Sequence, residues 1–260
     1  MMDGQGADEL FAGYPHYIGG RVMSLAAQLH PISMMRLLVA SSGLPGLSPR
    51  SVASVVAGSA APVATARRQK RSRGLASCLD HRWFLERGVD LTVPHVRERP
   101  SGVSRLKWQL WDSVTRTSLP TPLRYEDRNS VAHCVERRLP FLTTRIAEFA
   151  LILPDHYLLT DQGLSKAVLR TAMTGVVPSG ILRRRGKVGF ETPQAKWLLE
   201  SGTLVDALRD GFDPSLAPML RLDRLRATWR KEISSRSGQA FVLWRLLSTL
   251  SWIRRGHVAC

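Results

Sequence analysis

Apolar residues recur at helical spacing along much of the chain, whereas long apolar–polar alternation, the mark of a half-buried strand, is absent. At 104–117, Leu106, Leu110 and Val114 recur every four residues, which predicts an amphipathic helix that ends before Pro120 and Pro122. Similar spacing predicts helices at 9–21, 24–40, 124–138, 145–153, 165–173, 196–210, 220–234 and 239–255. We therefore expect a mainly α protein, with a strand remnant at 1–3 and a short hairpin near 157–161.

The composition divides the chain into three segments. Residues 1–40 hold a Gly-rich turn and the first helices, 41–103 are rich in Ser, Gly, Pro, Ala and Arg, and 104–260 form the helical part. We expect 41–103 to be largely irregular, punctuated by short helices, with a polar connector at 84–100. At 260 residues the chain is longer than a typical domain of about 100–200 residues, but one larger α-rich domain is compatible with this length.

The apolar fraction of 44% is sufficient for a buried core. No window approaches the roughly 18 uninterrupted apolar residues of a membrane span. Cys78, Cys134 and Cys260 are far apart and lack C-x-x-C spacing, which is typical of reduced proteins and excludes a cysteine zinc site. We expect a cytoplasmic protein that does not bind a membrane.

The net charge is +16, from 37 Lys and Arg against 21 Asp and Glu. Such a surplus can attract nucleic acid through phosphate contacts. The densest run, RRQKRSR at 67–73, has no interleaved aromatic residues on which bases could stack, so we interpret it as a solvated loop. A nucleic-acid-binding module remains an alternative that rests on charge alone.

Three motifs carry the candidate chemistry. The first is DGQGADELFAGY at 3–14, where Gly4 and Gly6 allow a sharp turn whose N–H groups can approach an anionic ligand. The helix that follows directs its positive dipole end toward the same turn. Asp8 is compatible with a phosphate there if a divalent cation lies between them. Taken alone, the motif also fits a plain turn with a helix cap.

The second motif is LRYEDRNSVAHCVERRLPFL at 123–142. The third comprises GLSK at 163–166 with the following Leu169 and Arg170, and RRRGKVGF at 183–190 with Thr192 and Pro193. In this order the three motifs resemble the synthetase domain of the glutamine-dependent asparagine synthetase family. Thr143 and Arg137 depart from the family pattern, which has a terminal Asp and more often a small residue there.

The resemblance implies the C-terminal part of an adenine-nucleotide α-hydrolase-like α/β synthetase domain, with most of its parallel sheet missing. It implies adenylation of the aspartate side-chain carboxylate by ATP with Mg²⁺, followed by attack of ammonia released from glutamine. The family's glutaminase domain and ATP pyrophosphate loop are absent from these 260 residues. We therefore expect 1–260 to be a partial domain that is inactive alone.

The resemblance also assigns roles to individual residues. Asp8 corresponds to a Mg²⁺ ligand, and Gln5 stands where many members have a Glu linked to acyl-adenylate formation. The ammonium of Lys187 would neutralise charge on the departing pyrophosphate. Glu136 would line the acceptor pocket or form a buried ion pair with Arg138. The nucleotide contacts implied are Asp3, Gly4, Gly6 and Lys166.

Two further alternatives stay open. Within the family, the chain could form an amide or lactam on another carboxylate during the tailoring of a peptide or polysaccharide. Outside catalysis, it could be a basic remnant or a partner subunit, because the pyrophosphate loop is absent from the sequence. These alternatives leave the carboxylate substrate undetermined.

Overall fold

The computed structural model describes residues 1–60, 75–91, 99–186 and 218–235, with shorter pieces at 192–193, 196–197, 200, 244–246 and 248–249. The chain divides into two compact units that alternate along the sequence. The first contains Met1–Ala61 and Arg97–Val188, and the second contains Pro62–Val96 and Gly189–Cys260. Lys187 and the basic run 67–73 lie outside the described residues.

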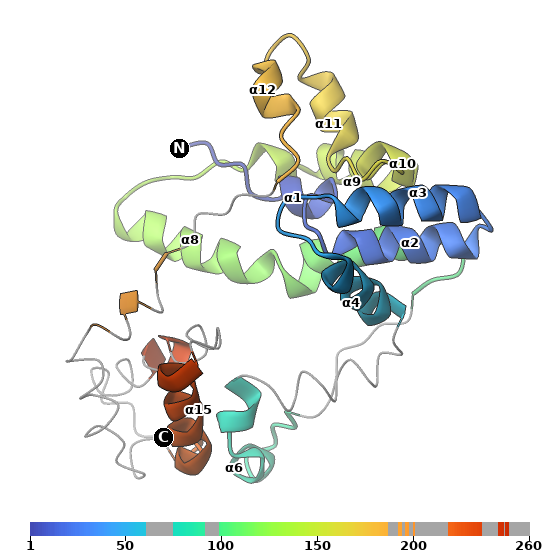
Figure 1. Cartoon of the computed structure of the whole chain (residues 1–260). Helices are drawn as coiled ribbons and strands as arrows, with labels where there is room; N and C mark the ends of the chain where they lie inside the picture. Colours follow the sequence, from blue (N-terminus) through green and yellow to red (C-terminus); the bar gives the residue numbers. More distant parts are fainter. Residues whose placement is uncertain are drawn as a thin grey trace. The chain divides into compact units, whose positions relative to one another are not determined.

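The first unit is built from helices (Figure 1). They are α1 (Ala7–Leu10), α2 (Tyr17–Ala27), α3 (Pro31–Ser42), α4 (Pro49–Ala60), α7 (Arg105–Asp112), α8 (Pro120–Ala132), α9 (Thr144–Ile152), α10 (Asp155–Leu158), α11 (Ala167–Ala172) and α12 (Ser179–Leu182). A π-helical turn η2 (Ser113–Thr117) follows α7, and a 3₁₀ turn η3 (Pro140–Leu142) precedes α9. The helices predicted at 104–117, 145–153 and 165–173 are confirmed, with ends shifted by a few residues.

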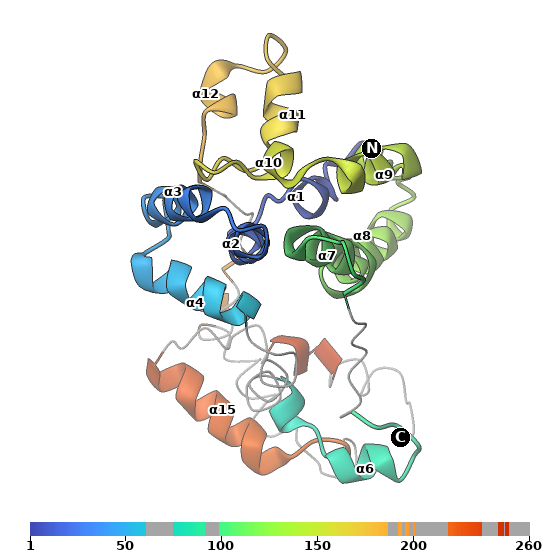
Figure 2. The same cartoon turned by 90° about the vertical axis from the view of Figure 1, so that its right-hand side faces the viewer.

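Helix α2 is the centre of this unit and packs against α3, α4 and α7 (Figure 2). Gly19 and Gly20 allow this close packing. A Cβ on Gly19 would lie 2.2 Å from Ser59 Oγ of α4, and one on Gly20 would lie 2.0 Å from Gln109 Oε1 of α7. The core around α2 is apolar, and its most buried residues include Leu10, Tyr17, Leu37, Leu106, Leu110, Ala150 and Leu158.

The predicted helices at 9–21 and 24–40 are divided differently in the structure. Residues 11–16 leave the helix, so α1 ends at Leu10 and α2 begins at Tyr17. Leu29 adopts a left-handed φ of 58°, and Pro31 then begins α3. Proline suits a first helical position because its missing N–H would have no partner there. The breaks therefore fall where backbone geometry, rather than apolar spacing, ends each helix.

The helix predicted at 104–117 does end before Pro120. The prediction that the next helix starts near residue 124 is wrong. Helix α8 begins at Pro120, and its first turn tolerates proline for the same reason as α3. Its predicted end at 138 is also wrong, because α8 ends at Ala132 and Cys134 adopts a left-handed φ of 55°. Residues 135–138 are consequently free of the helix and can pair with the N-terminal segment.

Segment 41–103, for which the sequence predicts irregular structure with short helices, contains α4, which packs on α2. Val52 and Ser59 of α4 are buried, although the helix contains mostly small residues. Tertiary contact can stabilise a helix that offers few large apolar side chains. Packing on the Gly19 face of α2 therefore decides this element.

Extended pairing among the described residues is confined to isolated bridges. Met2 and Arg138 form a parallel bridge, in which the Asp3 N–H donates to the Arg138 carbonyl at 3.0 Å and the Arg138 N–H donates to the Met1 carbonyl at 2.8 Å. This bridge lies at the predicted strand remnant. The predicted hairpin is shifted along the chain, because the antiparallel bridge joins Leu159 and Ser165.

The described part of the second unit contains η1 (Leu75–Cys78), α6 (His81–Leu85) and α15 (Leu222–Ser235). Helix α15 packs on η1 and confirms the helix predicted at 220–234. The Asp80 side chain caps α6 by accepting hydrogen bonds from the N–H groups of Arg82 and Trp83. Most of the helices predicted at 196–210 and 239–255 lies outside the described residues. In the part of the chain described here, no helix has the length and hydrophobicity required to cross a membrane.

Candidate functional site

The Gly-rich turn of the first motif leads from the bridge at Met2 into α1. Gly6 caps α1 in a left-handed conformation with φ of 92°, which glycine adopts without steric cost. A Cβ on Gly6 would also lie 2.2 Å from Leu142 Cδ2 of the second motif, whereas no atom of the other described residues lies within 4 Å of a Cβ on Gly4. Close packing on Leu142 therefore explains why position 6 requires a glycine, whereas position 4 has room for a side chain.

A polar network joins this turn to the second motif. The Arg137 guanidinium contacts the Asp3 carboxylate and also donates to Glu126 Oε2 at 2.6 Å. Glu126 Oε1 accepts a hydrogen bond from Gln5 Nε2 at 2.7 Å, and the Gln5 N–H donates to Asp3 Oδ1 at 3.2 Å. Arg137 thus joins the carboxylates of Asp3 and Glu126, and Glu126 binds the amide of Gln5.

The environment of Arg137 favours its charged form. Its side chain is only 10% exposed, and burial alone lowers the pKa of a guanidinium. The hydrogen bonds to Glu126 and Asp3 outweigh that effect and raise the pKa of Arg137 above its ordinary value. A single guanidinium nitrogen, Nη2, contacts both carboxylates, which positions them and the turn to which Asp3 belongs.

A second ion pair joins the first and third motifs. Lys166 Nζ lies 2.8 Å from Asp8 Oδ1, and both side chains are mostly shielded from solvent. Lys166 has a left-handed φ of 55°, and its N–H donates to the Phe11 carbonyl at 3.0 Å. Gly13 borders this pair so closely that a Cβ there would lie 1.8 Å from Asp8 Oδ1. The turn after α1 is therefore shaped around the ion pair.

Glu9, beside Asp8, is a buried carboxylate that the sequence did not single out. Its side chain accepts hydrogen bonds from the Tyr14 hydroxyl at 3.0 Å and the Ser118 hydroxyl at 3.3 Å, and the residue is 2% exposed. Burial, together with the Glu9 charge, raises the pKa of Tyr14. These contacts hold the motif against the start of α8, which indicates a positioning role for Glu9.

The structure separates the predicted site residues into distinct groups. Asp3 and Gln5 lie in the Arg137 network, and Asp8 and Lys166 form the second pair. Gly4 and Gly6 lie in the turn before α1. Lys187, the predicted catalytic lysine, lies outside the described residues, so its position stays a sequence prediction.

Glu136 is placed differently from the expectation of a buried pair. It does form an ion pair with Arg138, at 2.8 Å, but the two side chains are 75% and 72% exposed. Residues 136–138 are extended, and successive side chains of an extended segment point to opposite faces. Arg137 therefore points to the network, while its two neighbours point to solvent.

Glu126 and Arg137 are the site residues that sequence reasoning missed. Arg137 was noted only as a departure from the family pattern, and Glu126 was one charge within a predicted helix. Alternation at 136–138 opposite the predicted strand remnant at 1–3 is the signal that could have found Arg137. Nothing in helical spacing alone would have paired Glu126 with Gln5.

The described residues do not by themselves fit Mg²⁺. Among them, no group of three His, Cys, Asp or Glu side chains is arranged to hold a metal ion. Mg²⁺ prefers octahedral coordination by oxygen atoms. Asp8 supplies a carboxylate whose charge is already balanced by Lys166. We therefore derive no chemical step through a metal from these residues.

Comparison with known proteins assigns the family. The family model for asparagine synthase matches residues 1–254. Glutamine-hydrolyzing asparagine synthetase 1 of Bacillus subtilis (strain 168) is 39% identical over 72 residues, which are 28% of this chain and 11% of that protein. No solved structure matches the chain. Because the family model spans nearly the whole sequence, the chain belongs to the asparagine synthase family.

Proposed function

We propose that the chain supplies part of the synthetase site of a glutamine-dependent carbon–nitrogen ligase. In this proposal ATP adenylates the side-chain carboxylate of aspartate, and ammonia then displaces AMP to form the amide. The family assignment supports the reaction class. The fold that accompanies the proposal is the C-terminal part of an adenine-nucleotide α-hydrolase-like domain in a cytoplasmic enzyme.

The observation that carries the proposal is the contact of Arg137 with Asp3 and Glu126. This contact joins the Gly-rich turn to the second motif, although the two are far apart in sequence. A nucleotide-site turn must be held rigidly to stabilise charge that develops during reaction. Arg137 and Glu126 would therefore act as positioning residues, which keep Asp3 and Gln5 in place.

Gln5 carries a neutral amide where many relatives of the motif have a carboxylate. An amide can donate and accept hydrogen bonds but cannot supply charge or take up a proton. Its NH₂ group is engaged by Glu126. We propose that Gln5 orients the substrate carboxylate, while Lys187 of the third motif supplies the positive charge for the departing pyrophosphate.

The experiment uses the natural protein that contains this chain, supplied with ATP, Mg²⁺, aspartate and either glutamine or ammonia. We expect one AMP and one pyrophosphate for each asparagine formed. Formation of ADP and phosphate in place of AMP would contradict adenylation. A panel of other carboxylates tests the amide- or lactam-forming alternative, which gains support if aspartate is inert and another carboxylate drives AMP release.

The positioning role is tested by comparing Arg137→Gln with Arg138→Gln. Arg137 holds two carboxylates in a shielded network, whereas Arg138 makes an exposed pair with Glu136. Loss of a buried charge pair costs much more than loss of an exposed one. We expect Arg137→Gln to lower kcat by about tenfold or more and Arg138→Gln to change it less than about twofold. Equal losses of kcat in the two variants would show that the Arg137 network has no role in the reaction.

Lys187→Ala and Arg184→Ala test the predicted catalytic lysine in the same assay. Removing one preorganised charge that acts in the transition state typically costs about 10²–10³ in kcat. We expect this loss for Lys187→Ala, with little change in the KM for ATP, and a much smaller loss for Arg184→Ala. Equal, modest losses would show that this basic segment acts only through diffuse charge.

A further inference from the structure

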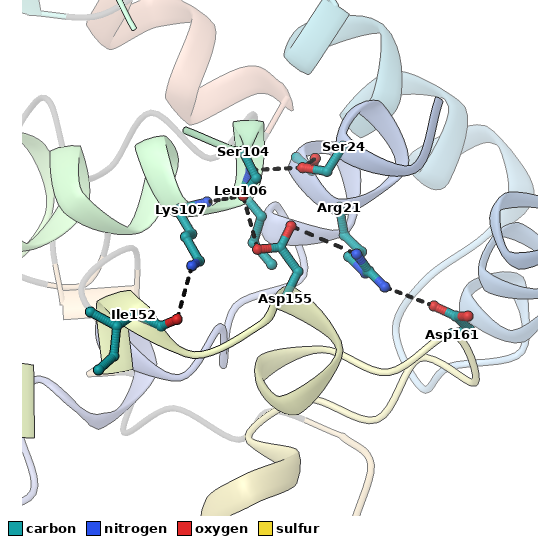
Figure 3. Close-up of polar contacts among 9 residues, drawn as sticks. Arg21, Ser24, Ser104, Leu106, Lys107, Ile152, Asp155 and Asp161 are labelled. Carbon is teal, nitrogen blue, oxygen red and sulfur yellow. Dashed lines mark hydrogen bonds and ion pairs between the residues drawn. The ribbon is translucent and has the colours of Figure 1, made fainter. Parts of the chain in front are cut away.

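A second polar site lies in the first unit and shares no residue with the Arg137 network. It is a pocket of about 460 Å³. Its walls include Arg21 of α2, Ser104 and Lys107 at the start of α7, and Asp155 and His156 of α10. Figure 3 shows Arg21, Ser104, Lys107 and Asp155 converging from three helices that are distant in sequence.

Buried charges form the floor of this pocket. The Arg21 side chain is 6% exposed, and its Nη2 lies 3.0 Å from Asp161 Oδ1. Asp155 is 5% exposed, and its Oδ1 accepts a hydrogen bond from Ser104 Oγ at 2.9 Å. Ser104 in turn accepts from the Lys107 N–H as the cap of α7. The contacts tie α2, α7 and α10 together around the pocket (Figure 3).

Two charged atoms of the floor lack a hydrogen bond. Arg21 Nε and Asp155 Oδ2 are both buried, and neither has a hydrogen-bond partner among the residues that the structure describes. The Arg21 Nη1 lies 3.7 Å from Asp155 Oδ2, which is attraction between charges but too long for a hydrogen bond. Buried polar atoms of this kind are normally satisfied. The floor of the pocket therefore holds one donor and one acceptor that are shielded from solvent and make no hydrogen bond with the described residues.

The charges around the pocket select the kind of ligand. Arg21 and Lys107 contribute two fixed cations, and Asp155 and Asp161 contribute two carboxylates. A ligand with a large net charge would gain attraction from one pair and repulsion from the other. A small molecule that carries both a cation and an anion would match both pairs. The volume lies within the usual range of small-ligand pockets, about 300–1,000 Å³.

We propose that this pocket binds a free zwitterionic α-amino acid. Its ammonium group pairs with the carboxylate of Asp161, whose side chain is 23% exposed, and its carboxylate pairs with the ammonium of Lys107. The more deeply buried charges of Asp155 and Arg21 act on these two groups without direct contact. Lys107 Nζ donates to the Ile152 carbonyl at 3.3 Å, which holds the ammonium of this lysine beside the pocket. The proposal does not depend on the ligase reaction, because none of the residues proposed for that reaction takes part.

The first experiment titrates the same purified protein as in the activity assay with glycine and follows binding by calorimetry. Glycine carries only the zwitterionic group, which separates this site from recognition of the aspartate side chain. N-acetylglycine lacks the ammonium, and glycinamide lacks the carboxylate. We expect both analogues to bind about tenfold or more weakly than glycine, the usual scale for losing one charge-assisted hydrogen bond. Absence of glycine binding up to about 100 mM, a concentration well above a millimolar Kd, would overturn the proposal.

Two conservative variants locate the site. Asp161→Asn and Lys107→Gln remove one charge each at positions that are less buried than Arg21. We expect either variant to weaken glycine binding by about tenfold while far-UV circular dichroism stays unchanged. Arg138→Gln, at an exposed position outside the pocket, is the matched control and leaves glycine binding unchanged. Unaltered binding in both pocket variants, or tighter binding of inorganic phosphate than of glycine, would refute the assignment.

Discussion

Gly13 is the residue on which the contact between Asp8 and Lys166 depends most directly. A Cβ at this position would lie 1.8 Å from Asp8 Oδ1 and 2.6 Å from Lys166 Cε, so the ion pair must move to admit it. We expect Gly13→Ala to destabilise the protein by about 1–3 kcal/mol, as overpacking does in well-packed sites. Urea denaturation followed by circular dichroism measures the change.

Gly4 provides the control for this prediction, because it belongs to the same motif but has open space around the position of its Cβ. We expect Gly4→Ala to leave the free energy of unfolding within about 0.5 kcal/mol of the parent protein. A destabilisation by Gly4→Ala equal to that of Gly13→Ala would mean that the turn, rather than the ion pair, limits stability.

Tyr17 predicts how stability responds to high pH. Burial, supported by the nearby Glu9 carboxylate, raises the pKa of Tyr17 above its ordinary value of 10.0. The folded protein therefore retains the phenolic proton after the unfolded chain has lost it. The stabilising contribution is complete below pH 10 and is lost progressively as the pH rises above 10, by up to about 1.4 kcal/mol per pH unit.

The alkaline dependence is checked by urea denaturation at several pH values from roughly 8 to 11, which bracket the ordinary tyrosine pKa. We expect Tyr17→Phe to flatten the fall above pH 10. Tyr125→Phe is the control, because Tyr125 is 54% exposed, and it leaves the fall unchanged. An identical fall in the parent and in Tyr17→Phe would show that other groups govern alkaline unfolding.

At the scale of elements, the contact between α2 and α4 depends on small side chains. Gly19 of α2 faces Ser59 and the Val55 carbonyl of α4, and a Cβ there would lie 2.5 Å from that carbonyl oxygen. We expect Gly19→Ala to separate the two helices and lower the melting temperature, since backbone atoms cannot yield as a flexible side chain does. A shift of several degrees corresponds to about 1 kcal/mol or more in a protein of this size.

Gly58 of α4 is the opposite case within the same pair of helices. It is exposed, and none of the surrounding atoms lies within 4 Å of the position of its Cβ. Alanine is favoured over glycine by about 0.5–1 kcal/mol inside an exposed helix. We expect Gly58→Ala to raise the melting temperature. Stabilisation by both Gly19→Ala and Gly58→Ala would contradict the close packing of α2 on α4.

Helix formation and helix limits were predictable to different degrees. The four-residue spacing of Leu106 and Leu110 predicted α7, and in the structure both side chains are fully buried on one face of that helix. The bounds of α4 were not predictable, since the segment offered only short helices at no fixed position and α4 is stabilised by contact of its small residues with α2. The start of α8 was missed because proline can either precede or begin a helix, and the sequence does not distinguish the two.

At the scale of the whole molecule, the net charge of +16 makes a prediction about nucleic acid. We expect any binding to duplex DNA to be independent of sequence and to fall steeply between roughly 50 and 200 mM salt, because it arises from released counterions. Fluorescence anisotropy with two unrelated duplexes measures both features. Tight binding of one duplex alone at the higher salt concentration would favour the nucleic-acid-binding alternative over the enzyme.

By itself, the sequence determined the family, because three ordered motifs combine residue types at fixed spacing, and it determined the helices with strong apolar periodicity. It also placed Asp3, Gln5, Asp8 and Lys166 among the candidate site residues. Only the tertiary structure brought Arg137 between Asp3 and Glu126, since that contact requires residues 136–138 to be extended beside the N-terminal segment. The pocket around Arg21 and Asp155 also depends on packing, because its charged residues come from separate helices and no local sequence pattern predicts that these helices pack together.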